Sequence, residues 1–212
     1  MTRTVIVGAN GQTGREAVAA CLARGHTVVA AVRRPETMDG VEDVEVRKIG
    51  LGDPRSLVAA IDGADAVVST LGHGGIGDAS RPTTLYGDSA RALRAAMRET
   101  ATRRLLVLSS AGVVQDDAAP WFYTKLLRKQ LINTYCDMAR METILEESED
   151  LEWTSVRLTY LLEGESKPYL VEDERIGRGN FRIHFVDAGG FLAREIDERH
   201  WVRRHPVLGY EG

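Results

Sequence analysis

The feature that most constrains the fold is a set of three glycines directly after the first apolar run. Residues 4–7 have the composition of a buried strand, and Gly8, Gly11 and Gly14 follow at once. Apolar residues at helical spacing then continue until Gly25, which can cap the helix. This order of strand, tight turn and helix brings backbone N–H groups and the positive end of a helix dipole together, where a pyrophosphate can bind.

Strands and helices alternate along the rest of the chain, and nearly every expected strand is apolar throughout. This pattern predicts a parallel sheet covered by helices on both faces, the α/β, doubly wound, Rossmann-type class. Further strands are expected at 26–32, 44–49, 65–70, 105–109, 153–158 and 182–186, and helices at 55–61, 84–100, 120–147 and 190–198.

Length and composition favour one domain over residues 1–212. The chain is 43% hydrophobic, enough for a single core, and it has neither an internal repeat nor a linker of low complexity. The least regular stretches, 72–82 and 163–181, follow the fourth and sixth strands. Since ligands of such sheets bind outside the carboxyl ends of the strands, we expect these loops to line the substrate pocket.

Charge and the lengths of the apolar runs limit the expected partners. A net charge of −4 gives no overall attraction to nucleic acid or to an anionic membrane. No run approaches the roughly 18 apolar residues of a membrane span, and the first is too short for a signal peptide. Cys21 and Cys136 lack the spacing of a metal or redox pair, which indicates packed, reduced thiols. We expect a cytoplasmic protein, monomer or homodimer, that binds no metal, nucleic acid or membrane.

The glycine turn stands at the first strand-to-helix junction of a parallel α/β chain, and this context predicts dinucleotide binding rather than a purely structural turn. The candidate cofactor-binding residues of the turn are Gly8, Asn10, Gly11, Gln12, Thr13 and Gly14. Arg33 and Arg34 end the second strand, where many such proteins carry an acidic residue for the ribose diol. Two arginines favour the 2′-phosphate of NADPH, and NADH is the alternative cofactor. The arginines could instead be a basic strand end that only water contacts.

Three further residues extend the predicted cofactor site. Asp53 could accept a hydrogen bond from the adenine amine, cap the helix that follows, or do both. Leu71 and Gly72 end the fourth strand, where a glycine lets the backbone pass the ribose.

Characteristic segments stand at residues 7–14, 32–34, 65–68, 82–84, 108–111 and 140–145, and together they span nearly the whole chain. They resemble the atypical short-chain dehydrogenase/reductases with NAD(P)H-binding domains, the group that contains the NmrA-like proteins. The segments at 82–84 and 140–145 resemble the type B biliverdin/flavin reductase branch in particular.

The resemblance implies an NADPH-dependent reductase that passes hydride from the nicotinamide to a conjugated acceptor such as a flavin, a quinone or an open tetrapyrrole. Ser110 matches the serine beside nicotinamide and substrate in such enzymes, and its neighbour Ser109 closes the fifth strand. Strand-end capping is the alternative role for this pair. A non-catalytic NmrA-like redox sensor that acts through a protein partner remains the second hypothesis, and a nucleotide-sugar epimerase or isomerase is a third.

Two departures from the family pattern limit the inference. The usual Tyr-x-x-x-Lys pair is absent, because Tyr123 is followed four residues later by Leu127 and Tyr135 by Ala139. Leu158, Thr159 and Tyr160 stand where the branch has Pro-Pro-His, so we expect a substrate other than biliverdin, or no tetrapyrrole chemistry at all. The Tyr160 phenol, the third candidate catalytic group with Ser110 and Ser109, could donate a hydrogen bond to the substrate or simply cover the pocket.

Several other residues allow two interpretations. His73 could transfer a proton or lie free on the surface, and the aromatic segment 121–123 could stack on an acceptor or partner, or pack in the core. Asp187 is predicted to cap the last helix, and the acidic run 146–150 to form a solvated turn.

Overall fold

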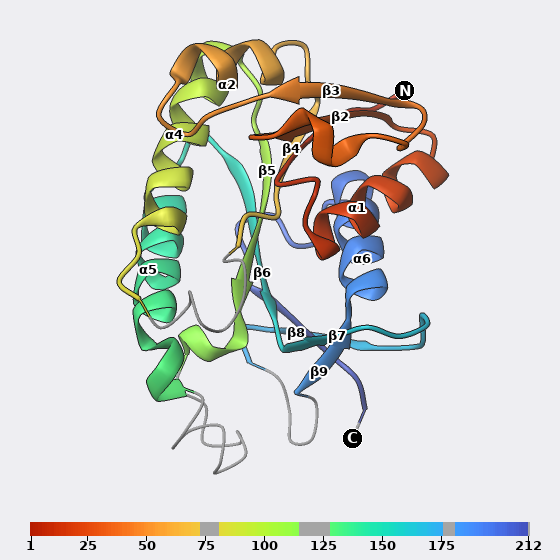
Figure 1. Cartoon of the computed structure of the whole chain (residues 1–212). Helices are drawn as coiled ribbons and strands as arrows, with labels where there is room; N and C mark the ends of the chain where they lie inside the picture. Colours follow the sequence, from red (N-terminus) through yellow and green to blue (C-terminus); the bar gives the residue numbers. More distant parts are fainter. Residues whose placement is uncertain (73–80, 115–127, 176–180, 212) are drawn as a thin grey trace.

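A computed structural model describes residues 1–72, 81–114, 128–175 and 181–211. Its main sheet has eight strands in the order β3-β2-β1-β4-β5-β6-β10-β8, and only β8 runs antiparallel to its neighbour (Figure 1). The predicted doubly wound parallel sheet in a single domain is therefore confirmed. The strands are β1 (Arg3–Val7), β2 (Thr27–Val32), β3 (Val44–Lys48), β4 (Ala66–Ser69), β5 (Arg104–Ser110), β6 (Glu152–Leu158), β8 (Leu170–Asp173) and β10 (Pro206–Gly209).

Helices cover both faces of this sheet (Figure 1). One face carries α1 (Gln12–Ala23) and α6 (Phe185–Glu198), which pack against each other. The other face carries α2 (Pro54–Ile61), α4 (Leu85–Glu99) and α5 (Arg128–Glu146). Short 3-10 turns lie at Pro35–Met38 and Ala111–Val113. No helix in the described ranges is long and apolar enough to cross a membrane.

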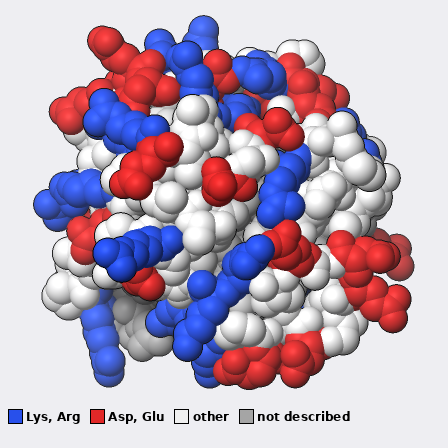
Figure 2. Space-filling view, turned by 90° about the horizontal axis from the view of Figure 1, so that it is seen from above, with Lys and Arg blue, Asp and Glu red and all other residues white. Residues whose placement is uncertain are grey.

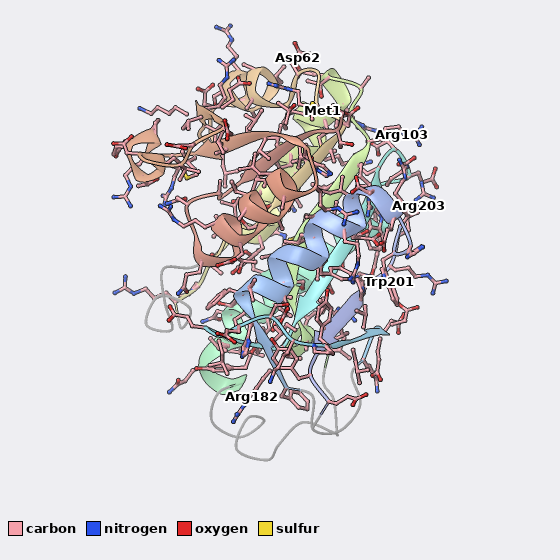
Figure 3. The ribbon with its side chains drawn as sticks, turned by 90° about the vertical axis from the view of Figure 1, so that its right-hand side faces the viewer. Met1, Asp62, Arg103, Arg182, Trp201 and Arg203 are labelled. Atoms are coloured by element: carbon pink, nitrogen blue, oxygen red, sulfur yellow. The ribbon has the colours of Figure 1, made fainter. Side chains whose placement is uncertain are left out.

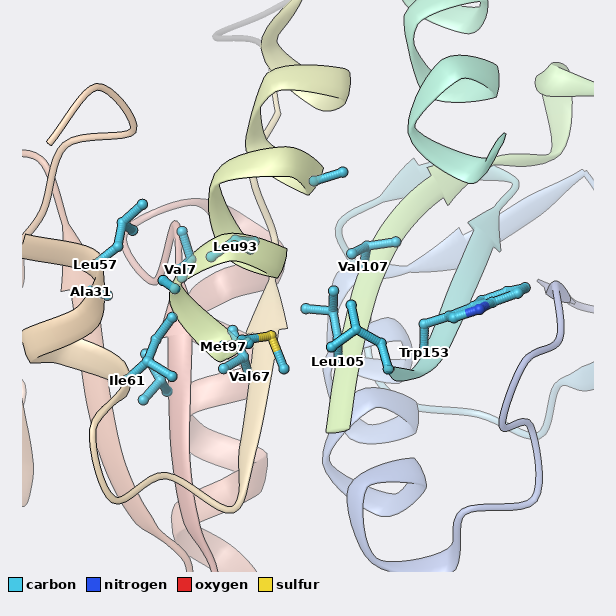
Figure 4. Close-up of a cluster of buried hydrophobic side chains, with 14 of the residues drawn as sticks. Val7, Ala31, Leu57, Ile61, Val67, Leu93, Met97, Leu105, Val107 and Trp153 are labelled. Atoms are coloured by element: carbon cyan, nitrogen blue, oxygen red, sulfur yellow. The ribbon is translucent and has the colours of Figure 1, made fainter. Parts of the chain in front are cut away.

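Two hydrophobic clusters fill the space between the sheet and the helices, because successive side chains of a strand point to opposite faces. In β1, Val5 and Val7 enter the cluster under α2, α4 and α5, whereas Ile6 enters the cluster under α1 and α6. Figure 4 shows part of the first cluster, with Val7, Val67 and Leu105 of the sheet and Leu93 and Met97 of α4. The sheet is thus buried on both faces, as its nearly continuous apolar strands require.

Four short strands were not predicted or were misplaced. β7 (Tyr160–Leu162) and β9 (Arg182–His184) pair in parallel as a second, small sheet. β10 extends the main sheet beyond β6, and β8 closes its edge. α6 begins at Phe185, earlier than expected, because β9 ends at His184.

Two residue interpretations are wrong. His184, not Asp187, is the N-cap of α6, and the buried Asp187 carboxylate instead accepts hydrogen bonds from Ser166 and Tyr210. Cys136 is exposed on α5 rather than packed. Cys21 is buried as expected, and burial raises the pKa of its thiol to about 12, so this thiol stays protonated.

Candidate functional site

The glycine turn lies at the centre of the sheet, between the carboxyl ends of β1 and β4. Gly8 has φ +84°, a conformation that favours glycine, and its N–H donates to Ala31 O at 3.0 Å. Thr70 Oγ1, just after β4, lies 3.1 Å from Gly8 O and 3.2 Å from Val7 O. Strand order reverses at this point, where doubly wound sheets bind their ligands.

The turn leads directly into a helix whose N-terminus is not capped by any side chain. Gly11 is the N-cap of α1, it has no side-chain hydrogen bond there, and the first turn contains no acidic residue. The first N–H groups of a helix have no partner within it, and the helix dipole makes their surroundings positive. An anionic phosphate therefore fits this end of α1.

The glycines of the turn differ in what a side chain would meet. A Cβ on Gly14 would lie 2.3 Å from Gly8 O, so α1 can approach β1 only without one. A Cβ on Gly11 would meet only Gly8 O, at an ordinary 3.5 Å. Close packing of the chain explains why residue 14 must be glycine. Around Gly11 the chain leaves open space, so a ligand can come close to the backbone there.

The other predicted residues of the turn have separate environments. Asn10 is exposed, and its carbonyl oxygen accepts a hydrogen bond from Arg15 Nε at 3.3 Å. Arg15 also donates to Thr37 O, which ties the turn to the segment after β2. Thr13 is buried, while the exposed Gln12 donates through Nε2 to Glu163 Oε1 at 3.0 Å.

Arg33 and Arg34 are exposed beyond the carboxyl end of β2, on the same edge as the turn. In the described ranges, neither guanidinium forms a hydrogen bond or ion pair, and only the carbonyl oxygen of Arg34 accepts hydrogen bonds, from Thr37. Asp53 caps α2, since its carboxylate accepts from Ser56 N at 3.4 Å. Leu71 is half-buried and Gly72 is exposed after β4.

The two candidate serines at the end of β5 behave differently. Ser110 Oγ accepts a hydrogen bond from Gly112 N at 3.2 Å, so this hydroxyl caps the 3-10 turn that follows the strand. Ser109 Oγ is buried, and among the described residues it has no hydrogen-bond partner. Because buried hydroxyls are nearly always paired, Ser109 is the stronger candidate for contact with a ligand.

The tyrosines provide no catalytic pair in the described residues. Tyr160 begins β7 with 49% of its surface exposed, and its backbone N–H donates to Phe181 O. Tyr135 is buried in the cluster beneath α5. Tyr123, Leu127, His73 and the rest of the aromatic segment 121–123 lie outside the described residues.

A cluster that the sequence did not reveal lies where α6 begins. Tyr210, just after β10, donates its hydroxyl to Asp187, and the hydroxyl accepts from His184 N at 2.9 Å. Lys167 Nζ lies 3.9 Å from the centre of the Tyr210 ring. Burial and the hydrogen bond to Asp187 raise the pKa of Tyr210, so this tyrosine stays protonated and does not replace the missing Tyr-x-x-x-Lys pair.

Two cavities lie at the opposite edge of the sheet. One, of about 360 Å³, is lined by residues near the amino ends of β6 and β10, including Trp153, Arg203 and His205. The other adjoins Met1 and Arg104. Figure 3 shows Met1 near the top of the view, Arg203 at its right-hand side and Arg182 near the bottom. Neither cavity adjoins the glycine turn.

Charges do not gather by sign on the face seen in Figure 2, where Lys and Arg alternate with Asp and Glu. Within the described residues, no group of three or more His, Cys, Asp or Glu could hold a metal ion.

Comparison with known proteins gives a family match. The model of a family described as NAD(P)H-binding matches residues 8–199. Pinoresinol reductase 2 of Arabidopsis thaliana is 36% identical over 81 residues, which are 33% of this chain and 25% of that protein. An isoflavone reductase homolog of Zea mays is 37% identical over 90 residues, 38% of this chain and 29% of the relative. The matches thus span only a quarter to a third of these curated relatives.

Solved structures share the fold over the whole chain. A short-chain dehydrogenase/reductase of Veillonella parvula in complex with NADP has a TM-score of 0.78 and 20% identity, covering 100% of this chain and 95% of that one. A candidate NADH-flavin reductase from Streptococcus pneumoniae has a TM-score of 0.77 and 23% identity, with 100% of both chains covered. At these identities the likeness concerns the fold alone.

Proposed function

Because this chain belongs to the NAD(P)H-binding family, we propose that it is a reductase that uses NADPH to reduce a conjugated small molecule such as a flavin or a quinone. The observation that carries the proposal is the uncapped N-terminus of α1 behind a glycine turn at the switch point of the sheet. The family supports an NAD(P)H-binding oxidoreductase, and the acceptor and the choice of NADPH are our inference.

The preference for NADPH follows from Arg33 and Arg34. Both side chains are exposed on the edge of the sheet that carries the glycine turn, and neither forms an ion pair within the described residues. A guanidinium pairs well with a phosphate because two parallel N–H donors match two oxygens. These arginines would bind the 2′-phosphate, while the backbone N–H groups after Gly11 would bind the pyrophosphate.

When bound, NADPH supplies the hydride, and the protein's part is to position the acceptor. Ser109 Oγ, buried and without a partner in the described residues, would donate a hydrogen bond to a polar atom of the acceptor. Ser110 would hold the end of β5 through its bond to Gly112. Tyr160, half-exposed beyond β6, would cover or contact the acceptor, and the final proton would come from water.

Binding and turnover together test this proposal. NADPH and NADH are titrated by calorimetry into the native chain, Arg33→Ala and the control Arg103→Ala, which changes an exposed arginine at the far edge of the sheet (Figure 3). We expect Arg33→Ala to weaken NADPH binding about tenfold and to leave NADH binding and the control unchanged. Loss of near-ultraviolet NADPH absorbance with FMN, a quinone or a tetrapyrrole then identifies the acceptor class. Equal effects on both nucleotides would refute the role of Arg33.

The second candidate is a sensor that binds NAD(P)H without turnover and reports to a protein partner. Two observations favour it: the absence of a Tyr-x-x-x-Lys pair in the sequence, and the burial of Tyr135 in the core. Tight nucleotide binding without reduction of any acceptor in the panel would support the sensor over the reductase. In either case we propose a cytoplasmic monomer or homodimer that binds neither nucleic acid nor membrane.

A further inference from the structure

A short segment after β7 contacts the N-terminal ends of both α6 and α1. This strap, residues 163–169, is held at α6 by Ser166 Oγ, 2.6 Å from Asp187 Oδ1, and by Glu165 O, 2.8 Å from His184 Nδ1. Farther along, Arg194 Nη2 donates to Tyr169 OH at 3.1 Å. The first residue of the strap, Glu163, lies beside the start of α1, because Gln12 Nε2 donates to Glu163 Oε1 at 3.0 Å. The two helices pack side by side on one face of the sheet (Figure 1).

The strap is pressed against α6 at Gly164. A Cβ at this position would lie 2.3 to 2.7 Å from three atoms of the His184 ring, so only glycine allows this contact without a shift. The body of the strap is therefore fixed by backbone packing and by the bonds to Asp187, His184 and Arg194. Glu163, one residue earlier, is exposed, and within the described residues its side chain forms a hydrogen bond with Gln12 alone.

Glu163 places a negative charge at the helix end that the cofactor would use. Its Oε1 lies 3.0 Å from Nε2 of Gln12, and Gln12 is the first residue of α1. The helix has no acidic residue in its first turn and no side-chain cap, so the anion beside it comes from the strap. A pyrophosphate bound there would be repelled by the Glu163 carboxylate, because both are negatively charged. The two anions would also compete for the Gln12 N–H, which can donate to only one of them at a time.

We propose that Glu163 is an affinity-determining residue of the cofactor site, a built-in anion that the pyrophosphate must displace from Gln12. The inference rests on the proposed binding of NAD(P)H at α1. Displacement costs little, because a hydrogen bond between two exposed side chains contributes weakly. Since the rest of the strap is anchored to α6, the Glu163 side chain moves while residues 165–169 stay in place. Cofactor binding thereby changes one wall of the predicted substrate pocket.

The test compares two glutamates of the same strap. NADPH and NADH are titrated into the native chain, Glu163→Gln and the control Glu165→Gln. The Glu165 side chain is exposed, and the hydrogen bond of this residue to His184 uses its backbone oxygen. We expect Glu163→Gln to tighten binding of both nucleotides about fivefold, because the amide removes the like charge shared by both pyrophosphates. Added salt should shrink this gain, since it screens the repulsion. Glu165→Gln should bind as the native chain does.

The outcomes separate this inference from the proposed function. An unchanged or weaker affinity of Glu163→Gln, with native binding intact, overturns the role of Glu163 and leaves the reductase standing. A gain for NADPH alone would also overturn it, because the 2′-phosphate and not the pyrophosphate would then face this residue. If the native chain binds neither nucleotide, the proposed function falls, and the inference falls with it. Equal thermal midpoints of the three proteins confirm that the exposed substitutions leave the fold intact.

Discussion

An added methyl group would meet different surroundings at each glycine of the first turn. At Gly14 it would overlap the carbonyl of Gly8 and the backbone of Ala9, and at Gly11 it would make one ordinary contact. Gly11 also has φ −71°, which any residue adopts. The two glycines of this motif therefore differ in their structural role: Gly14 lets the helix pack, and Gly11 leaves open space in which we expect a phosphate to bind.

This difference predicts that one alanine substitution destabilises the fold and the other leaves its stability almost unchanged. Gly14→Ala should lower the free energy of unfolding by about 1–3 kcal/mol, because the backbone of residues 8 and 9 must shift to admit Cβ. Gly11→Ala should change it by less than about 0.5 kcal/mol. Urea denaturation measures both. Equal destabilisation by the two would contradict the assignment.

Local patterns in the sequence predicted some structural roles correctly, and three-dimensional contacts decided the others. Asp53 caps a helix that begins with proline, a signal readable within four residues. The same logic failed at Asp187, because a buried Tyr210 more than twenty residues away uses its carboxylate. Ser109 and Ser110 stand side by side, yet only the structure shows which hydroxyl is committed to a cap and which has no partner in the described part of the chain.

Among the elements, the contact between α1 and α6 matters most to the site, because α1 carries the turn. Gly189 of α6 lies against α1, where a Cβ would come within 2.6 Å of Glu16 and 2.7 Å of Ala17. At the neighbouring Gly190 a Cβ would meet nothing within 4 Å. The adjacent glycines thus provide a matched pair of variants.

Gly189→Ala should lower the free energy of unfolding by about 1–3 kcal/mol, since α6 must move away from α1. Gly190→Ala should be neutral or up to about 1 kcal/mol more stable, because alanine favours the helix. Thermal and urea unfolding of both variants provide the measurement. A Gly189→Ala protein as stable as the native one would show that the two helices are not in close contact.

A buried ion pair joins α5 to β6. Glu142 of α5 accepts from Arg157 Nη2 at 2.9 Å and from Ser155 Oγ at 3.0 Å, and His205 Nδ1 lies 3.5 Å away, near enough for an ion pair but without a hydrogen bond. Burial acts to raise the pKa of Glu142, but its contacts with His205 and Arg157 outweigh burial and lower this pKa to about 2.

A lowered carboxyl pKa stabilises the fold above the unfolded-state value of 4.5, and this contribution disappears as pH falls toward 2. At neutral pH, Glu142→Gln should therefore unfold with a free energy lower by on the order of 3 kcal/mol. The difference from the native protein should shrink between pH 4.5 and 2. Urea unfolding across this range checks the prediction, and a difference independent of pH would contradict it.

For the whole molecule, the apolar strands and the spacing of their helices were enough to predict the doubly wound sheet. They could not predict β8 and β10, because each has four residues, pairs with strands distant in sequence and shows no local periodicity. The strap and the cluster around Tyr210 escaped prediction for the same reason. The glycine turn and its strand-to-helix junction were predictable because their signals are local, whereas the contacts of 160–175 and 181–210 depend on residues distant in sequence.

The central claim is that the turn before α1 binds the pyrophosphate of a nicotinamide dinucleotide, and calorimetric titration of NADPH into the native chain and Gly11→Ala tests it most directly. We predict that the native chain binds NADPH and that Gly11→Ala binds it at least about tenfold more weakly at an unchanged thermal midpoint, because Cβ enters the phosphate position without disturbing the fold. No binding of NADPH or NADH by the native chain, or full affinity in Gly11→Ala, would contradict the account.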